Sequence, residues 1–362
     1  MSLTLPDFPW DSLNSYRERA AAHPKGVIDL SVGSPIDPTP RVATEALVGA
    51  AQAPSYPLTA GTPELRTAMA EWWQRRRNTA ELDTTEVIPS IGSKEMVGLL
   101  PSLLGISSSD VVVIPEIAYP TYAIGAHMVG AQVVASNNPA DWPEGTKLIW
   151  LNSPGNPTGQ VHDVAYLREA LRVARKLGAV LASDECYAEL GWDGVSVPSL
   201  LDREVVQGDR SGALALYSTS KQSNLAGYRA ALVAGDKELI QGILLARKHL
   251  GLIVPAPIQS ALAEVLTDDD HVAVQKERYR LRRERVREAL SDAGFRIEHS
   301  EAGLYLWATR DENCWDTVSW CAERGVLVAP GVFYGEAGSN HVRVALTVTD
   351  SNAAELMDRF SL

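Results

Sequence analysis

The sequence has few of the features that mark secreted, membrane-spanning or nucleic-acid-binding proteins. Its 3 cysteines among 362 residues form neither a paired disulfide framework nor a metal-binding CxxC spacing. No apolar run approaches the roughly 18 residues of a membrane span, and the start of the chain lacks the pattern of a signal peptide. A formal net charge of -12 disfavours nucleic acid as a partner, because phosphate backbones require clustered cations. We therefore expect a cytoplasmic protein with no metal site and no membrane or nucleic-acid partner.

The composition is that of a globular protein, with 45% hydrophobic and 22% charged residues. Short continuous apolar runs alternate with helix-like segments such as residues 164–178, and the clearest runs are 111–115, 147–154, 179–185 and 213–220. Uninterrupted apolar strands are buried on both faces, which predicts an α/β fold with a mainly parallel central sheet. The richest basic stretch, residues 276–288, is interleaved with glutamates and is typical of a solvent-exposed helix rather than a docking surface for an acidic partner.

Ligands of parallel sheets bind outside the carboxyl ends of the strands, so the polar residues that follow each apolar run are candidates for a site. Ser93 and Lys94 follow Gly92 at the start of a predicted helix, where free N–H groups attract an anion. Ser93 could equally be an ordinary helix cap. Tyr119 follows the run at 111–115, either as an aromatic contact for a ligand or as packing over the turn before Pro120.

Three further segments carry candidate groups. Asn156 lies in the turn NSPGNPTG, where an amide can donate to a ligand oxygen, although turn formation alone uses such residues. Asp184 lies two residues beyond an apolar run and precedes Tyr187 by three residues, and a buried carboxylate there needs a cationic or hydrogen-bonding partner. The segment STSKQSNLAGYR contains Ser218, Lys221 and Arg229.

Together these groups match one ligand. Ser93, Ser218 and Arg229 supply donors for a phosphate, and Tyr119 supplies an aromatic plate. Asn156 and Tyr187 supply two donors for a ring oxygen. Asp184 supplies a carboxylate for a protonated ring nitrogen, and Lys221 supplies an amine for a carbonyl. A planar, phosphorylated, hydroxylated pyridine aldehyde satisfies all of these requirements. That molecule is pyridoxal 5'-phosphate (PLP).

The chain resembles the class I/II aminotransferases of the fold-type I PLP superfamily over nearly its full length, from SVGSPID to HVRVAL. The most specific motifs are NPTG, the DExY variant DECY, and STSKQSNLAGYR, which matches the lysine signature SxSKxxxxxGxR. The resemblance implies that Lys221 bonds covalently to the cofactor aldehyde and carries a proton at the substrate α-carbon. It also implies that Asp184 keeps the pyridine nitrogen protonated. Asn156 and Tyr187 would hydrogen bond the ring's 3' oxygen.

The resemblance also assigns the remaining candidate residues. Tyr119 would stack on the ring, and the phosphate would be bound by Ser93, Lys94, Ser218 and Arg229, with Tyr56 reaching in from the partner subunit of a homodimer whose active sites are shared. Gly33 and Asn156 would line the substrate end of the site. Arg343 would grip the α-carboxylate and leave the C–H bond exposed for deprotonation. The alternative for Arg343 is a surface arginine paired with an acid.

The expected reaction is transfer of an amino group between an amino acid and 2-oxoglutarate. The alternatives are an aspartate- or alanine-type aminotransferase and a PLP-dependent C–S lyase of the same fold. A non-catalytic sensor is disfavoured because no basic helix-turn-helix precedes residue 30. Overall likeness to actinobacterial N-succinyldiaminopimelate aminotransferases suggests N-succinyl-LL-2,6-diaminopimelate, an intermediate of lysine biosynthesis, as the amino donor. We expect residues 40–245 to form a large cofactor-binding domain, and residues 1–39 with 246–362 to form a small α+β domain.

Overall fold

The largest sheet has seven strands and is mainly parallel, as the apolar runs predict. In this computed structural model, which describes residues 5–361, its strands lie in the order β2 (Val87–Ile91), β8 (Ala230–Gly235), β7 (Ala213–Ser218), β6 (Val180–Asp184), β5 (Thr146–Asn152), β3 (Val111–Ile114) and β4 (Gln132–Ala135). Only β8 runs antiparallel to its neighbours, β2 and β7. The fold is therefore α/β, in agreement with the sequence.

Helices cover both faces of this sheet, which explains why its central strands show no polar alternation. Leu148 and Trp150 face one apolar core with α4 (Ser93–Leu103), α5 (Thr121–Met128) and α9 (Lys237–Leu250). Ile149 and Leu151 face the opposite core with α3 (Pro63–Arg77) and α6 (Val164–Leu177). Successive residues of β5 thus enter different cores, as the two-residue period of a strand requires.

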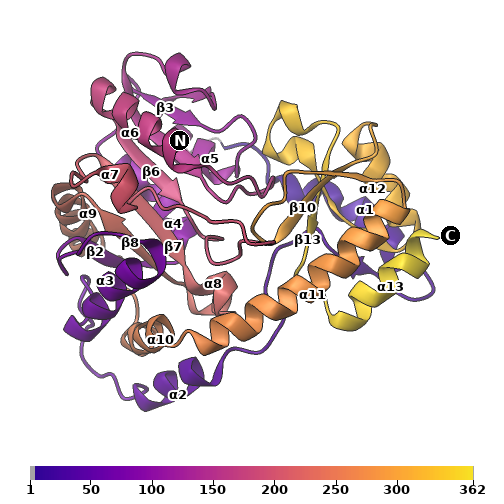
Figure 1. The fold of residues 1–362 in the computed structure, drawn as a ribbon, viewed down its shortest axis with the longest axis horizontal. Coiled ribbons are helices and arrows are strands. Elements are labelled where there is room, and N and C mark those ends of the chain that lie inside the picture. The colour runs from indigo at the N-terminus through magenta and orange to yellow at the C-terminus, as the bar shows by residue number, and fades with distance from the viewer. Residues whose placement is uncertain (1–4, 362) are drawn as a thin grey trace.

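A second lobe surrounds a four-stranded antiparallel sheet. The strands lie in the order β12 (Ala329–Pro330), β13 (Val342–Ala345), β10 (Tyr305–Thr309) and β9 (Arg296–Glu298). Beside them, β1 (Ile28–Asp29) pairs in parallel with β11 (Val326–Leu327). Helices α1 (Asn14–Ala21), α12 (Cys314–Glu323) and α13 (Asp350–Phe360) lie in this lobe, on the right of Figure 1.

Helix α11 (Asp270–Asp292) runs from the larger lobe to the smaller one (Figure 1). Its basic stretch is a helix with many exposed residues, as predicted, but Arg282 and Arg283 depart from the predicted solvated face because they are buried. Arg282 binds Asp37 through both terminal nitrogens at 2.6 and 2.7 Å and Asp350 through Nε at 2.7 Å. The Asp37 pair is largely buried, whereas Asp350 is 65% exposed, and the two ion pairs connect α11 to the N-terminal segment and to α13.

The boundary between the two predicted domains, 40–245 against 1–39 with 246–362, stays a prediction. Helix α10 (Ala256–Thr267) contributes Leu262 and Leu266 to the core that also contains α3 and α6. It contacts α2 (Arg41–Gly49) as well as α3. Any division of the chain therefore has to account for the packing of α10 with the larger lobe.

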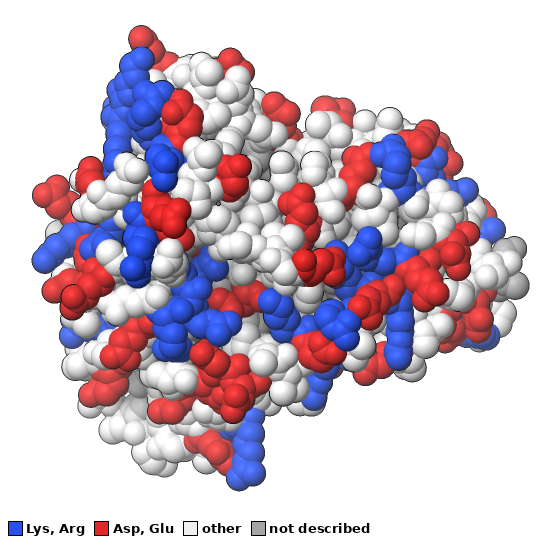
Figure 2. Space-filling model, viewed as in Figure 1, with Lys and Arg blue, Asp and Glu red and all other residues white. Residues whose placement is uncertain are grey.

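The surface carries mixed charge, with blue and red side chains interspersed over the face shown in Figure 2. Among residues 5–361, no helix is long and apolar enough to cross a membrane. The same part of the chain contains no group of three or more His, Cys, Asp or Glu side chains arranged to hold a metal ion.

The site is positioned by the carboxyl ends of three adjacent parallel strands. Asn152, the last residue of β5, is in register with Asp184, the last residue of β6, and Asp184 is in register with Leu216 of β7. Asn152 donates its side-chain amide to the backbone oxygens of Asp184 and Pro154 at 2.9 and 3.1 Å. Asn152 therefore holds the turn in place, and Asp184 is left to face the space beyond the strand ends.

Candidate active site

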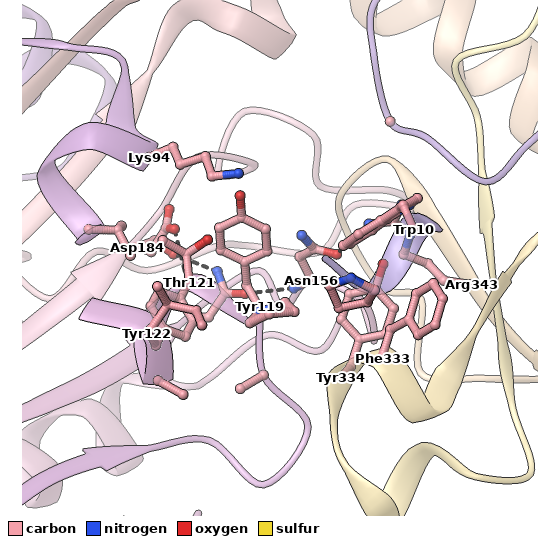
Figure 3. Close-up of a pocket in the computed structure, with 18 of the residues that line it drawn as sticks. Trp10, Lys94, Tyr119, Thr121, Tyr122, Asn156, Asp184, Phe333, Tyr334 and Arg343 are labelled. Carbon is pink, nitrogen blue, oxygen red and sulfur yellow. Dashed lines mark hydrogen bonds between the residues drawn. The ribbon is translucent and has the colours of Figure 1, made fainter. Parts of the chain in front are cut away.

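A cleft of about 1330 Å³ lies beyond these strand ends, between the two lobes. Figure 3 shows side chains from both lobes turned toward it. Its lining contains eleven of the twelve predicted site residues, namely Gly33, Ser93, Lys94, Tyr119, Asn156, Asp184, Tyr187, Ser218, Lys221, Arg229 and Arg343. Tyr56 does not line the cleft and is 96% exposed. Its expected contact is with a partner subunit, so its role stays a prediction.

One end of the cleft is suited to an anion. Gly92 is the N-cap of α4 with a φ of 74°, and no side chain caps the helix, so the alternative that Ser93 is an ordinary cap is wrong. The backbone N–H groups at the start of α4 are thus available to a ligand, and the helix dipole favours negative charge there. The Arg229 guanidinium lies against Gly92, where a Cβ atom would overlap it. Ser218 lies in the same lining and donates to Ser220 Oγ at 2.8 Å.

Aromatic groups form a wall of the cleft beside the anion-binding end. Tyr119 packs edge-on against Tyr122, with ring centroids 5.9 Å apart. The Lys94 ammonium lies 5.9 Å from the centre of the Tyr119 ring, above it in Figure 3. A flat ligand with a negatively charged end would find both a surface for stacking and a cation here.

Asp184 is a buried carboxylate without a cationic partner in the described part of the chain. It is 7% exposed and accepts hydrogen bonds from the Tyr122 hydroxyl at 3.0 Å and the Cys186 backbone N–H at 3.2 Å. Burial raises the pKa of Asp184, although these hydrogen bonds oppose the shift. A buried carboxylate is stabilised when a cation is placed beside it. A protonated pyridine nitrogen is such a cation.

Lys221 lies in the short helix α8 (Thr219–Gln222), directly after β7. Its ammonium donates to the backbone oxygen of Gly33. Burial, together with the positive charges of Arg343 and Arg229, lowers the pKa of Lys221, while Tyr305 and Cys186 oppose the shift. A lowered pKa leaves more of the amine in the neutral form that attacks a carbonyl.

Arg343 lies in β13 at the other end of the cleft. It is 3% exposed, and its Nη1 and Nη2 donate to Asn156 Oδ1 at 3.0 Å and to the Ser31 backbone oxygen at 2.6 Å. The alternative of a surface arginine paired with an acid is therefore wrong. Its Nε is buried and has no hydrogen-bond partner in the described part of the chain. A buried guanidinium with an unused donor is suited to a carboxylate ligand.

Two functional tyrosines were missed by sequence reasoning. Tyr122 donates to Asp184, and the hydroxyl of Tyr305 lies 3.1 Å from that of Tyr187. Tyr122 follows Tyr119 by three residues, and this short spacing is a signal that could have indicated a shared site. Tyr305 lies in a strand whose five residues are all buried, so no alternation distinguishes it from core residues.

The residues present fit PLP on three independent grounds. An anion site, a partnerless buried carboxylate and an amine of lowered pKa line one cleft. The side-chain oxygen of Asn156 is occupied by Arg343, which leaves its amide N–H groups as donors. Tyr187 is the neighbouring candidate donor for a ring oxygen.

Comparisons with known proteins agree with this geometry. The family model described as "Aminotransferase class I and II" matches residues 25–360. The chain is 50% identical to 4-dedimethylamino-4-oxo-anhydrotetracycline transaminase OxyQ of Streptomyces rimosus, over 99% of each chain. It is 32% identical to an LL-diaminopimelate aminotransferase of Dehalococcoides mccartyi, over 96% of this chain and 93% of that one. The solved structure of a probable N-succinyldiaminopimelate aminotransferase from Thermus thermophilus has a TM-score of 0.88 and 29% identity, over 98% and 99% of the two chains.

Proposed function

Because the chain belongs to the class I and II aminotransferases, which depend on PLP, we propose that it moves an amino group between an amino acid and 2-oxoglutarate, with Lys221 as the catalytic amine. The observation that carries this proposal is the placement of Lys221 and Asp184 in one cleft. Lys221 there has a lowered pKa, and Asp184 is a buried carboxylate without a cationic partner in the described residues.

Bound PLP supplies a ring that accepts electrons from the substrate's α-carbon. Asp184 would hold the ring nitrogen in its protonated form. Lys221 would hold the cofactor through its aldehyde group and, as the base beside the substrate, would accept the α-carbon proton on its side-chain amine. Its lowered pKa suits this exchange, because a general base works best when its pKa lies near the working pH.

Arg343 would orient the substrate. Its contacts with Asn156 and Ser31 fix the plane of the guanidinium, and the unused Nε is a donor for the substrate α-carboxylate. A carboxylate held this way leaves the α C–H bond free to stand perpendicular to the cofactor ring. Proton removal is then favoured over loss of carbon dioxide. Tyr187 and Asn156 would donate to the ring's 3' oxygen, and Tyr119 would stack on the ring.

The anion-binding end would hold the cofactor phosphate. The free N–H groups at the start of α4, the hydroxyls of Ser93 and Ser218, and the guanidinium of Arg229 surround this end. Lys94 lies over the Tyr119 ring and would add positive charge nearby.

For the amino donor, we propose N-succinyl-LL-2,6-diaminopimelate as the first candidate. The proposal is supported by the likeness to the Thermus thermophilus protein and to the Dehalococcoides mccartyi relative. Besides the α-carboxylate at its reacting end, this substrate carries two distal carboxylates, which need cations or several donors at the far end of the cleft.

A second candidate substrate, as amino donor or as amino acceptor, is a compound with a large ring system. Phe8, Trp10 and Phe333 form an aromatic wall at the substrate end, with neighbouring ring centroids 5.3 to 5.4 Å apart. Such a wall suits a flat apolar group. The 50% identity to a transaminase of an anhydrotetracycline supports the same candidate.

The test is a panel of amino donors with 2-oxoglutarate as acceptor and glutamate as the measured product. Succinylated diaminopimelate, LL-diaminopimelate, aspartate, alanine and aromatic amino acids form the panel, with the Lys221→Ala variant as the control. Glutamate formation supports an aminotransferase. Release of ammonia and a keto acid without glutamate would show a lyase instead. Brisk turnover of aspartate or alanine, with none of succinylated diaminopimelate, would remove the first candidate donor.

We also propose a cytoplasmic homodimer, in which Tyr56 reaches the phosphate site of the partner. Tyr56, Val48 and Leu58 are 96%, 73% and 56% exposed, which suits a surface that a second copy covers. Sedimentation of the protein with bound PLP measures the oligomeric state. A fully active monomer would contradict the shared site.

A further inference from the structure

Tyr305 lies where the cofactor side of the cleft meets the substrate side. It is 4% exposed, and its hydroxyl is 3.1 Å from the hydroxyl of Tyr187. The guanidinium carbon of Arg343 lies 4.0 Å from the centre of its ring. Its hydroxyl also fills the space where a Cβ atom of Gly33 would stand. Tyr305 therefore contacts three parts of the site. The first two are Tyr187, the proposed hydrogen-bond donor to the cofactor, and Arg343, the proposed binder of the substrate carboxylate. The third is the segment around Gly33, whose backbone oxygen accepts a hydrogen bond from Lys221.

The direction of the hydrogen bond between the two tyrosines follows from their donors. Each hydroxyl has one hydrogen to donate. If Tyr187 donates its hydrogen to the cofactor's 3' oxygen, its own oxygen can only accept from Tyr305. Burial raises the pKa of Tyr187 well above its usual value. Burial also acts to raise the pKa of Tyr305, but the charges of Arg343 and Lys221 outweigh it and leave that pKa lowered. The more acidic hydroxyl is the better donor, so the same direction is favoured electrostatically.

We propose that Tyr305 is a positioning residue that donates its hydroxyl hydrogen to Tyr187 and so orients and strengthens the hydrogen bond from Tyr187 to the cofactor's 3' oxygen. The inference rests on the proposed function only in requiring PLP in this cleft with Tyr187 beside its 3' oxygen. The positive charge of Arg343 lies over the Tyr305 ring and makes the Tyr305 hydroxyl a stronger hydrogen-bond donor. The contacts thus connect the carboxylate-binding group to the electronic state of the cofactor.

Tyr334 provides a matched control in the same protein. It is 2% exposed, lines the same cleft and lies 5.1 Å from the guanidinium carbon of Arg343, measured to its ring centre. Its hydroxyl has no hydrogen-bond partner in the described part of the chain. Removing that hydroxyl deletes the same atom from a similar environment, without touching Tyr187.

The experiment is a pH titration of the visible absorbance of the PLP-loaded protein, with no substrate present. A donor to the 3' oxygen stabilises its negative charge and lowers the pH midpoint of the absorbance change. A bond to a charged oxygen shifts a midpoint by roughly one to two pH units, and a neighbouring hydrogen bond strengthens it by about 10–30%. Tyr305→Phe should therefore raise the midpoint by about 0.3 pH unit. Tyr187→Phe should raise it further, and Tyr334→Phe should leave it unchanged.

The double variant Tyr187→Phe/Tyr305→Phe decides whether Tyr305 acts through Tyr187. Its midpoint should equal that of Tyr187→Phe alone, because the hydrogen bond from Tyr187 to the cofactor's 3' oxygen, through which Tyr305 would act, is already absent. An unchanged midpoint in Tyr305→Phe would overturn the proposal. So would an equal shift in Tyr334→Phe, or a further shift in the double variant. The titration needs bound PLP but no turnover, so a failure to find transamination would refute the proposed function and leave this measurement interpretable.

Discussion

Replacing Asp184 with asparagine should have opposite effects on catalysis and on the stability of the cofactor-free protein. The substitution keeps the shape of the side chain. An amide oxygen can still accept from the Cys186 N–H, and the new amide can donate to the Tyr122 hydroxyl. What is lost is the negative charge. Asp184→Asn therefore tests the charge of Asp184 with little change in packing.

The size of the catalytic loss follows from the burial of Asp184. The carboxylate is 7% exposed and forms no ion pair within residues 5–361, so the pyridinium nitrogen would be its main ionic partner. Two unit charges 4 Å apart interact by about 4 kcal/mol at an effective dielectric constant of 20. Each 1.4 kcal/mol is a tenfold change, so the rate of α-proton removal should fall by about 10²–10³.

The effect on the cofactor-free protein has the opposite sign. Burial raises the pKa of Asp184 above its usual value of 3.8, so the folded state disfavours the ionised form. Its contribution to stability is complete below pH 3.8 and is lost as the pH rises through the folded-state pKa. At pH 7 the buried charge therefore destabilises the protein without PLP, and Asp184→Asn should raise its melting temperature. The difference should shrink as the pH approaches 4.

Two measurements check the prediction. Stopped-flow absorbance with an amino acid and no keto acid measures the first half of the reaction, and thermal denaturation at pH 7 and pH 4 measures the stability of the cofactor-free protein. Tyr122→Phe serves as a control, because it removes one hydrogen bond and keeps the charge. A near-normal half-reaction in Asp184→Asn, or a cofactor-free variant less stable than wild type at pH 7, would show that the charge does not have the role given to it here.

Three further outcomes are expected. Lys221→Ala should abolish the visible absorbance of lysine-bound PLP and reduce turnover by many orders of magnitude, because the nucleophile and the proton carrier are lost together; absorbance and turnover rates comparable to wild type would contradict this. Arg77→Met should lower the free energy of unfolding, measured in urea, by about 3–5 kcal/mol. The reason is that Glu185, which is 0% exposed and lies 3.2 Å from Arg77, would keep a buried charge without its cation. The control is Arg280→Met, which removes an exposed ion pair and should barely move the urea midpoint. Acidification should destabilise the folded protein through Asp37. Burial acts to raise the pKa of Asp37, but hydrogen bonds from Arg282 and Gln275 outweigh it and lower that pKa below 3.8. The stabilising effect of Asp37 is therefore present above pH 3.8 and is lost as the pH falls through its folded-state pKa. Asp37→Asn should therefore flatten the acid limb of stability measured by chemical denaturation.

The cofactor side of the site was predictable because its residues follow apolar strands directly. Asp184 and Ser218 are the last residues of their strands, and Lys221 lies three residues beyond Ser218. Parallel strands place their carboxyl ends at one edge, so local sequence is enough to bring these groups together. The same reasoning predicted the mainly parallel sheet, because strands with no polar alternation must be covered on both faces.

The parts that sequence did not predict depend on contacts between distant segments. Arg282 and Arg283 fit the pattern of a solvated basic face, yet both are buried in α11. Their carboxylate partners, Asp37, Asp350 and Asp193, lie 68 to 245 residues away in the sequence. Local charge patterning describes only neighbours on one helix, so it cannot show that a distant carboxylate meets the arginine.

The contacts at the centre of the cleft join the two lobes directly, which makes binding and chemistry interdependent. Arg343 of β13 donates to Asn156, which follows β5, while Tyr305 of β10 meets Tyr187, which follows β6. Lys221, which follows β7, donates to the backbone oxygen of Gly33, in the segment after β1. Each pair takes one member from beyond the seven-stranded sheet and the other from the part of the chain around the smaller sheets. A shift of one lobe relative to the other would change all three contacts at once, so substitutions that loosen the lobes should alter KM and kcat together, even when they lie outside the cleft.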